Sequence, residues 1–305
     1  MIVSFESLVP GRLEADEERA LLERSSFAVT FATGGRTIRV RFSDRAVGEH
    51  FAYRYGDMLA GEGAEPAKRF SVIGDGTRTV FWSSRDDVRI WPRPELPVPV
   101  ASFLTDGAVM NDVFVRGTLR GLHAAVVRGR RGVAAIVGDS TAGKTTTAVA
   151  CARRGLTFYS DERCVLADGL AHPFLRALTL RAGGRRLLAA DDVDDTLGIG
   201  AKLRAWQGRD EVLVRPSSLF GARAGGDPAP LTDVIAIDGT GERPEIAEVP
   251  VHALLPDIAR TMWSAELGLD RAAAILRDFA AVRCARLTLG TPDATARAIA
   301  ARLEG

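Results

Sequence analysis

A short glycine-rich segment constrains this chain more than any other feature. It reads Gly138-Asp139-Ser140-Thr141-Ala142-Gly143-Lys144-Thr145. Residues 133–137 before it form an apolar run with the length of a buried strand, and residues 146–154 after it form a helix-like segment that stops at Gly155. Strand, glycine-rich turn and helix in this order predict an α/β unit in which the turn joins the end of the strand to the start of the helix.

The same segment predicts a phosphate-binding loop. Its glycines let the backbone N–H groups point at phosphate oxygens, and the helix N-terminus that follows favours negative charge. Lys144 would reach the terminal phosphates, and the hydroxyl of Thr145 would coordinate Mg²⁺. Only three of the 40 basic residues are lysines, so a basic residue placed here by chance would usually be arginine. The lysine at this position therefore supports the phosphate-loop interpretation. The expected cofactors are ATP and Mg²⁺, bound by Gly138, Asp139, Ser140, Thr141, Ala142, Gly143, Lys144, Thr145 and Thr146.

Composition bounds the class of protein. The 305 residues are 46% hydrophobic, enough for one large domain or two ordinary ones with a substantial core. Forty basic residues stand against 39 acidic ones, which gives a net charge of +1. A balance this even offers no electrostatic attraction for nucleic acid or for an anionic membrane, so we expect neither as a partner.

The cysteines and the N-terminus bear on the compartment. Cys151, Cys164 and Cys284 lie far apart with no CxxC pair, which argues against a disulfide framework and against a zinc site. The first residues lack a basic region followed by an apolar stretch, and no run approaches the roughly 18 apolar residues of a membrane span. A cytoplasmic location is therefore expected.

The pattern along the chain predicts two domains. Residues 27–31 and 37–42 alternate in polarity around Gly34-Gly35, which predicts a hairpin. The proline-rich stretch 91–99 is the candidate boundary, so an N-terminal α+β domain is expected over residues 1–100 and a nucleotide-binding domain over residues 101–305. Further strands are expected at 70–73, 78–82, 124–127, 156–159, 164–167, 171–174, 234–237 and 285–289, and helices within 11–24, at 252–263, at 271–279 and from Pro292.

Two adjacent carboxylates follow the strand expected at 156–159. Asp161 and Glu162 come after Ser160, and Asp161 lies 17 residues beyond Lys144. One helix, one turn and one strand fit this separation, which puts both acids at the carboxyl end of a strand beside the phosphate loop. A kinase needs a Mg²⁺ ligand and a base for the attacking hydroxyl at this place. Transport and motor ATPases usually carry their acidic strand further along the chain, and neither an LSGGQ-like nor an NKxD-like signature is present.

With these motifs the chain resembles the HPr kinase/phosphorylase superfamily, especially the HPr-kinase-like P-loop kinases of peptide-modification gene clusters. The resemblance rests on Leu122-His123-Ala124-Ala125, the loop 138–145, Arg154-Gly155 and Ser160-Asp161-Glu162, in that order and at similar spacings. It covers residues 120–165. It implies an α/β kinase core related to HPr kinase and phosphoenolpyruvate carboxykinase, with a smaller N-terminal α+β domain, and an ATP-dependent phosphotransferase acting on a Ser or Thr hydroxyl.

The resemblance also implies roles for individual residues. Glu162 would be the catalytic base, Asp161 would hold Mg²⁺ together with Thr145, and His123 would orient or tune one carboxylate. Arg181 occupies a family arginine position, and with Lys144 it completes the expected catalytic set. The chain departs from the family at Thr141, where glycine is usual, at Glu162, where the bifunctional enzymes have aspartate, and at Thr179, where a family glutamate is replaced. The Glu162 departure fits the HPr-kinase-like relatives better than the bifunctional enzymes.

Three functions are compatible with these residues. The first is a Mg²⁺-ATP kinase acting on a Ser/Thr or terminal hydroxyl of a peptide or small protein. The second is a kinase of a small-molecule hydroxyl, such as a free amino acid or a sugar-like metabolite, and the third is an ATP-sensing regulatory module without transfer. The loop does not distinguish ATP from GTP. Family relatives include hexamers, so a homo-oligomer is an open expectation.

Overall fold

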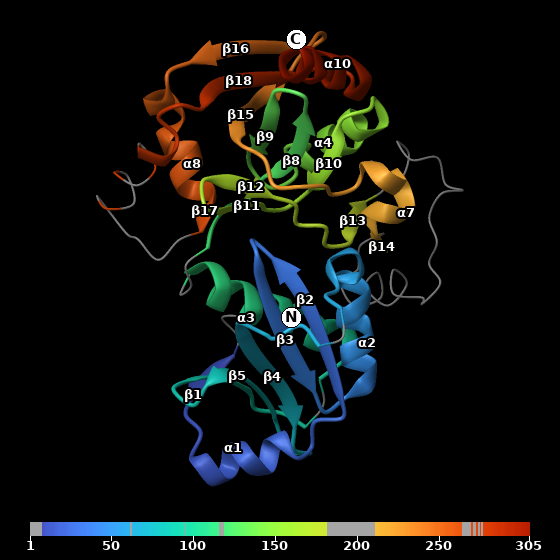
Figure 1. The fold of residues 1–305 in the computed structure, drawn as a ribbon, viewed down its shortest axis with the longest axis vertical. Helices are drawn as coiled ribbons and strands as arrows, with labels where there is room; N and C mark the ends of the chain where they lie inside the picture. The colour runs from blue at the N-terminus through green and yellow to red at the C-terminus, as the bar shows by residue number, and fades with distance from the viewer. Residues whose placement is uncertain are drawn as a thin grey trace. The chain divides into compact units, whose positions relative to one another are not determined.

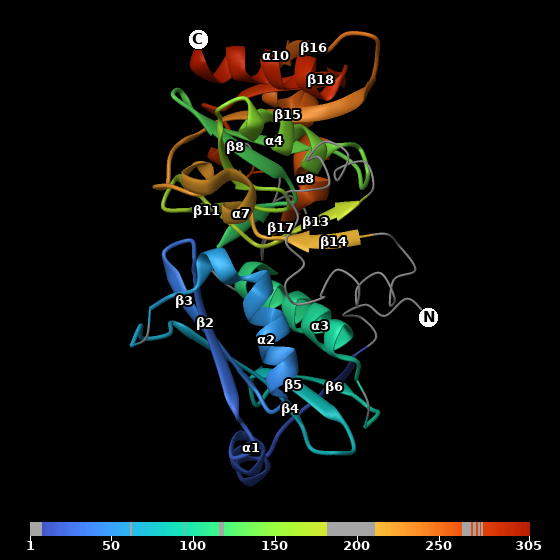
Figure 2. The ribbon, with the colours of Figure 1, turned by 90° about the vertical axis from the view of Figure 1, so that its right-hand side faces the viewer.

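The computed structural model describes residues 8–61, 63–94, 96–115, 119–181, 211–263, 270, 273, 275 and 277–305 (Figures 1 and 2). These residues form a mixed α/β protein with two compact units, which we describe separately. The described residues up to Val113, with residues 211–213, belong to the first unit, and those from Phe114 to Arg181 and from Val214 onward belong to the second.

The first unit is built on a sheet whose described strands follow the order β1-β6-β5-β4-β3-β2. Neighbouring strands are antiparallel, apart from the parallel pair β3 and β4. The strands are β1 (Val9–Gly11), β2 (Phe27–Thr33), β3 (Arg36–Phe42), β4 (Lys68–Gly74), β5 (Thr79–Ser84) and β6 (Asp87–Trp91). The helices are α1 (Ala15–Leu22), α2 (Arg45–Arg54) and α3 (Val98–Met110), with a 3₁₀ turn at Gly56–Met58. A π-helical segment, Asn111–Val115, spans the division of the chain between the two units.

The hairpin expected around Gly34-Gly35 is confirmed. Both glycines have positive φ, 55° and 70°, which is the backbone shape that a tight two-residue hairpin turn requires. The alternation in β3 buries Ile38, Val40 and Phe42 on one face of the sheet. Helix α2 packs against β2 and β3, so this face becomes part of the core of the first unit.

The proline-rich stretch does not separate two domains. It ends strand β6 and begins α3, whose second residue is Pro99. Proline is tolerated in the first turn of a helix because the N–H that it lacks would have no partner there. The units divide between Val113 and Phe114, so the predicted boundary at residue 100 falls inside α3.

The second unit contains a sheet with the order β10-β8-β9-β15-β18-β16 among the described strands. Strands β9, β15 and β18 are parallel, and all five residues of the predicted strand 133–137 are fully buried. Helices α4 and α10 pack on one another beside the sheet (Figure 1). The strands are β8 (Ala125–Gly129), β9 (Gly132–Val137), β10 (Thr157–Ser160), β15 (Leu231–Thr240), β16 (Glu245–Val249) and β18 (Arg283–Leu289).

A smaller sheet in the same unit has the order β12-β11-β7-β17. Its strands are β7 (Arg120–Leu122), β11 (Cys164–Ala167), β12 (Leu170–His172) and β17 (Met262–Trp263). Leu122 in β7 faces Cys164 on one side and Met262 on the other. This sheet therefore brings the segment after α8 next to the residues that precede β8.

The remaining elements belong to the second unit, apart from residues 211–213 at the start of β14, which belong to the first. They are α4 (Lys144–Arg153), α7 (Pro216–Phe220), α8 (Leu255–Thr261), α10 (Pro292–Glu304), the 3₁₀ turns Gly221–Arg223 and Val251–Leu254, and strands β13 (Leu178–Arg181) and β14 (Glu211–Val214). Thr291 caps α10 as predicted, since its hydroxyl accepts a hydrogen bond from the N–H of Ala294 at 3.3 Å. The helix expected at 271–279 lies largely outside the described residues.

Candidate functional site

The glycine-rich loop, residues 138–143, joins the carboxyl end of β9 to the first residue of α4. Gly143 has φ 103° at the helix N-cap and Gly138 has φ 157°, and both positions are crowded. A Cβ at Gly138 would lie 3.2 Å from Ile237, and one at Gly143 would lie 3.1 Å from Leu289. These two neighbours belong to β15 and β18, so the loop lies over the carboxyl ends of the parallel strands.

Lys144 curls back over this loop. Its Nζ donates hydrogen bonds to the carbonyl oxygens of Gly138 and Asp139, each at 2.8 Å, and the residue is only 7% exposed. Burial lowers the pKa of the ammonium, while the nearby carboxylates of Asp139 and Asp161 act in the opposite direction. The loop therefore holds a positive charge in its own concave side, where an anionic group could replace the two carbonyls as its partner.

The turn after β10 aims the two predicted carboxylates. The hydroxyl of Ser160 accepts hydrogen bonds from the N–H groups of Glu162 at 3.1 Å and Arg163 at 2.9 Å, which fixes the backbone of this turn. Asp161 then points to α4, and the hydroxyl of Thr145 donates to its Oδ2 at 3.5 Å. The structure thus brings Lys144, Thr145 and Asp161 close to one another.

The acids and the glycine-rich loop follow two strands that are not direct neighbours in the sheet. The strand that carries the acids is not the neighbour of β9, because β8 lies between β9 and β10. The tight turn between Gly129 and Gly132 pairs β8 with β9 from Ala125 to Gly129, so β10 cannot form hydrogen bonds with β9 on that side. Because β8 is antiparallel to both strands, β9 and β10 point the same way and their carboxyl ends share one edge of the sheet.

The surroundings of Asp161 change its acidity. Burial raises the pKa of its carboxyl to about 6, and Arg176, the Thr145 hydroxyl and Lys144 oppose this rise only in part. Burial costs the charged form its hydration, so a cation placed beside this group would be strongly favoured. Magnesium prefers such an oxygen ligand, together with waters and phosphate oxygens.

Glu162 is held by an arginine that the sequence did not single out. Its Oε2 forms an ion pair with Arg176, whose side chain is only 8% exposed, in the segment between β12 and β13. Arg163 lies close by, buried against the rings of Phe114 and Phe174 at 5.6 and 5.8 Å from their centres. No local sequence pattern distinguishes Arg176 from the other basic residues, because its partner is contributed by a different strand end.

His123 lies in the bend between β7 and β8. Its backbone N–H donates to the carbonyl of Thr261 at 2.7 Å, and the next N–H, of Ala124, donates to the carbonyl of Glu162 at 3.2 Å. Burial, together with the positive charges of Lys144, Arg163 and Arg176, lowers the pKa of the imidazole to about 4. His123 is therefore neutral at pH 7 and sits between the end of α8 and the carboxylates.

The other predicted residues are placed less fully. Thr146 lies in the first turn of α4, and Thr179 and Arg181 lie in β13, where the side chain of Arg181 is outside the described part of the chain. Within the described residues, no group of three or more His, Cys, Asp or Glu side chains could hold a metal. Thr145 and Asp161 would supply two oxygen ligands, which fits magnesium because that ion commonly keeps several waters and binds phosphate oxygens.

Comparisons with known proteins give little beyond this geometry. No family model matches the chain, and no curated protein matches it. Among solved structures, the HPr(Ser) kinase/phosphatase from Coxiella burnetii matches with 11% sequence identity and a TM-score of 0.28, covering 61% of this chain and 99% of that one. At this TM-score the match carries no argument. Among the described helices, none is both long enough and apolar enough to cross a membrane.

Proposed function

We propose that this chain is a kinase that transfers the γ-phosphate of Mg²⁺-ATP to a Ser/Thr or terminal hydroxyl of a peptide or small protein. Its second unit would then be a P-loop core related to HPr kinase and phosphoenolpyruvate carboxykinase. One observation carries the proposal: the Thr145 hydroxyl and the Asp161 carboxylate, 3.5 Å apart, converge beside a loop that holds the Lys144 ammonium in its concave side. An ammonium, a hydroxyl and a carboxylate in this arrangement suit a metal-bound polyphosphate.

Nucleotide binding would exchange partners within the glycine-rich loop. The Lys144 ammonium would leave the carbonyls of Gly138 and Asp139 and contact the β- and γ-phosphates. Thr145 and Asp161 would hold Mg²⁺, which when bound neutralises part of the phosphate charge. The N–H groups at the start of α4 would face the phosphates as well.

Transfer requires a base for the acceptor hydroxyl, and Glu162 is proposed for that role. As the hydroxyl oxygen bonds to the γ-phosphorus, the bond from that phosphorus to the β–γ bridging oxygen breaks, ADP leaves and the hydroxyl proton passes to the Glu162 carboxylate. Arg176 orients this carboxylate through the ion pair. Neutral His123 adds no further positive charge next to it.

The test is to incubate the purified chain with γ-labelled ATP, Mg²⁺ and a lysate of the source cells, and to separate the label by size. Label on a peptide or protein supports the proposal, and label on a small molecule moves the assignment to a metabolite kinase. Label that stays on ATP or appears only as free phosphate favours a regulatory module. Glu162→Gln should bind ATP and lose transfer by about 10²-fold or more, whereas Lys144→Ala should lose both.

A further inference from the structure

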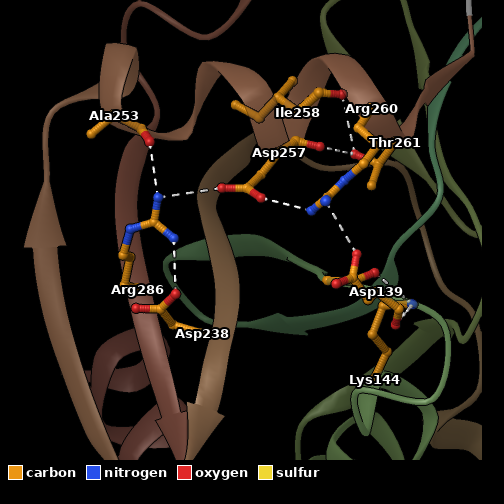
Figure 3. A network of polar contacts seen from close by, with 10 residues as sticks. Asp139, Lys144, Asp238, Ala253, Asp257, Ile258, Arg260, Thr261 and Arg286 are labelled. Atoms are coloured by element: carbon orange, nitrogen blue, oxygen red, sulfur yellow. Dashed lines mark hydrogen bonds and ion pairs between the residues drawn. The ribbon is translucent and has the colours of Figure 1, made fainter.

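Arg260 connects helix α8 to the glycine-rich loop. Its Nη1 lies 3.3 Å from Oδ1 of Asp139, and its Nη2 lies 2.9 Å from Oδ1 of Asp257, three residues earlier on the same helix. Figure 3 shows the guanidinium between these two carboxylates, with Lys144 on the other side of Asp139. The residue that Arg260 contacts is thus the one whose carbonyl also accepts a hydrogen bond from the Lys144 ammonium.

The position of α8 is fixed at the candidate site by two backbone contacts. The carbonyl of Thr261, next to Arg260, accepts a hydrogen bond from the N–H of His123 at 2.7 Å. Met262 then pairs with Leu122 as β17 joins β7. Arg260 is therefore carried on an element that is anchored beside both the loop and the carboxylates.

The two contacts of Arg260 differ in strength. The side chain of Asp257 is only 19% exposed, and its other carboxylate oxygen lies 3.5 Å from Arg286. Arg286 in turn contacts the carboxylate of Asp238 at 3.2 Å and the carbonyl of Ala253 at 3.1 Å. Figure 3 shows this series of polar contacts. The side chains of Asp139 and Arg260 are 74% and 57% exposed, and an ion pair so open to water contributes little stability. The Asp257 contact is the anchor, and the Asp139 contact is exchangeable.

We propose that Arg260 binds the terminal phosphate of the nucleotide, an inference that rests on the proposed function. On binding, Nη2 keeps its contact with Asp257, and Nη1 turns from the Asp139 carboxylate to a γ-phosphate oxygen. A guanidinium has five N–H donors and matches phosphate in geometry and charge. The same arginine then stabilises the charge on the phosphoryl group during transfer, as arginines supplied in cis do in other phosphate-loop enzymes.

The chemistry of the loop supports this assignment. Asp139 puts a negative charge into a loop that would receive a polyanion, and repulsion between the two would weaken binding. Arg260 balances that charge while the nucleotide is absent. When the nucleotide is present, Arg260 lies within reach of both negative groups and reduces the repulsion between them.

Affinities for ATP and ADP test the proposal, measured by titration calorimetry with Mg²⁺ at constant salt. Arg260→Ala should weaken ATP binding by about tenfold to a hundredfold, the loss expected for one charge-assisted hydrogen bond, and ADP binding by less than about threefold. Arg260→Lys should restore only part of the ATP affinity, because lysine lacks the planar fork. Arg297→Ala is the matched control, since Arg297 is 61% exposed and pairs with Asp293 one turn earlier on α10.

The outcomes separate this inference from the proposed function. If the unmodified chain binds both nucleotides and Arg260→Ala changes both affinities by the same factor, or changes neither, the phosphate-binding role of Arg260 is overturned and the proposed function stands. If the unmodified chain binds neither nucleotide, the proposed function fails and this inference fails with it. A selective loss of ATP affinity in Arg260→Ala, absent in Arg297→Ala, supports the assignment.

Discussion

Thr141 stands in the glycine-rich loop with a backbone that threonine rarely adopts. Its φ is 70°, in the left-handed region, and β-branched side chains are strongly disfavoured there. Glycine, in contrast, reaches this region without strain. The loop therefore stores strain at Thr141, and strain of this kind is often found where a loop must hold a ligand.

Thr141→Gly should relieve this strain and raise the free energy of unfolding by about 1 kcal/mol, after subtracting the extra freedom of glycine in the unfolded chain. The measurement is urea unfolding at pH 7. Thr146→Gly is the matched control: it replaces a threonine in the first turn of α4, where a helical conformation is required, and should lower stability. Equal losses in the two variants would contradict the strain at Thr141.

The ion pair between Glu162 and Arg176 is the basis of a second prediction about single residues. Arg176→Met leaves the carboxylate without its partner and should lower the free energy of unfolding by about 2 kcal/mol, less than for a fully buried pair because the Glu162 side chain is 27% exposed. In a Glu162→Gln background the same change should cost about 1 kcal/mol or less. Identical losses in both backgrounds would mean that Arg176 acts through packing rather than through this carboxylate.

At the scale of elements, the turn between β4 and β5 depends on one carboxylate. Oδ1 of Asp75 accepts hydrogen bonds from the Thr77 N–H at 2.8 Å and hydroxyl at 2.6 Å and from the Arg78 N–H at 3.0 Å, and Oδ2 accepts from Arg78 Nε at 3.1 Å. Burial alone would raise the pKa of Asp75, but these hydrogen bonds lower it well below its usual range. The turn is thus stabilised by the charged form of the side chain.

Asp75→Asn should lower the free energy of unfolding by about 1 kcal/mol at neutral pH, the net value of such hydrogen bonds. Because the pKa is depressed in the folded state, the contribution is complete above the unfolded value near 3.8 and is lost as the pH falls toward the folded value. Urea unfolding should therefore show the same difference between the two proteins at pH 7 and pH 5 and a smaller one at pH 3. A difference that grows at pH 3 would contradict this account.

The sequence predicted those elements whose signals lie within a few consecutive residues. Strand β9 and helix α4 follow from the apolar run and the glycine-rich turn, and α10 follows from Thr291-Pro292. Helix α2 was missed although Asp44 marks its start, accepting a hydrogen bond from the Ala46 N–H at 2.8 Å. Contacts between distant segments left no local signal. The insertion of β8 beside β9, the burial of Arg176 and the approach of α8 to His123 all depend on which strands pair.

At the scale of the whole molecule, the predicted binding residues and the stabilising turn belong to different units. The glycine-rich loop, Asp161, Glu162 and His123 lie in the second unit, and Asp75 lies in the first. A ligand that binds only the folded state stabilises the unit that carries its site, by about 2.7 kcal/mol at a hundredfold excess over Kd. Chains with two units often unfold in more than one transition.

Calorimetry of the full chain should therefore resolve two transitions. Mg²⁺-ATP should raise the Tm of the transition in which the second unit unfolds, and Thr141→Gly should raise the Tm of the same transition. Asp75→Asn should lower the Tm of the other, because its turn belongs to the unit without the loop. Scans of each variant with and without nucleotide make the assignment. If Mg²⁺-ATP shifts the transition that Asp75→Asn shifts and leaves the Thr141→Gly transition in place, nucleotide binding does not occur at the glycine-rich loop.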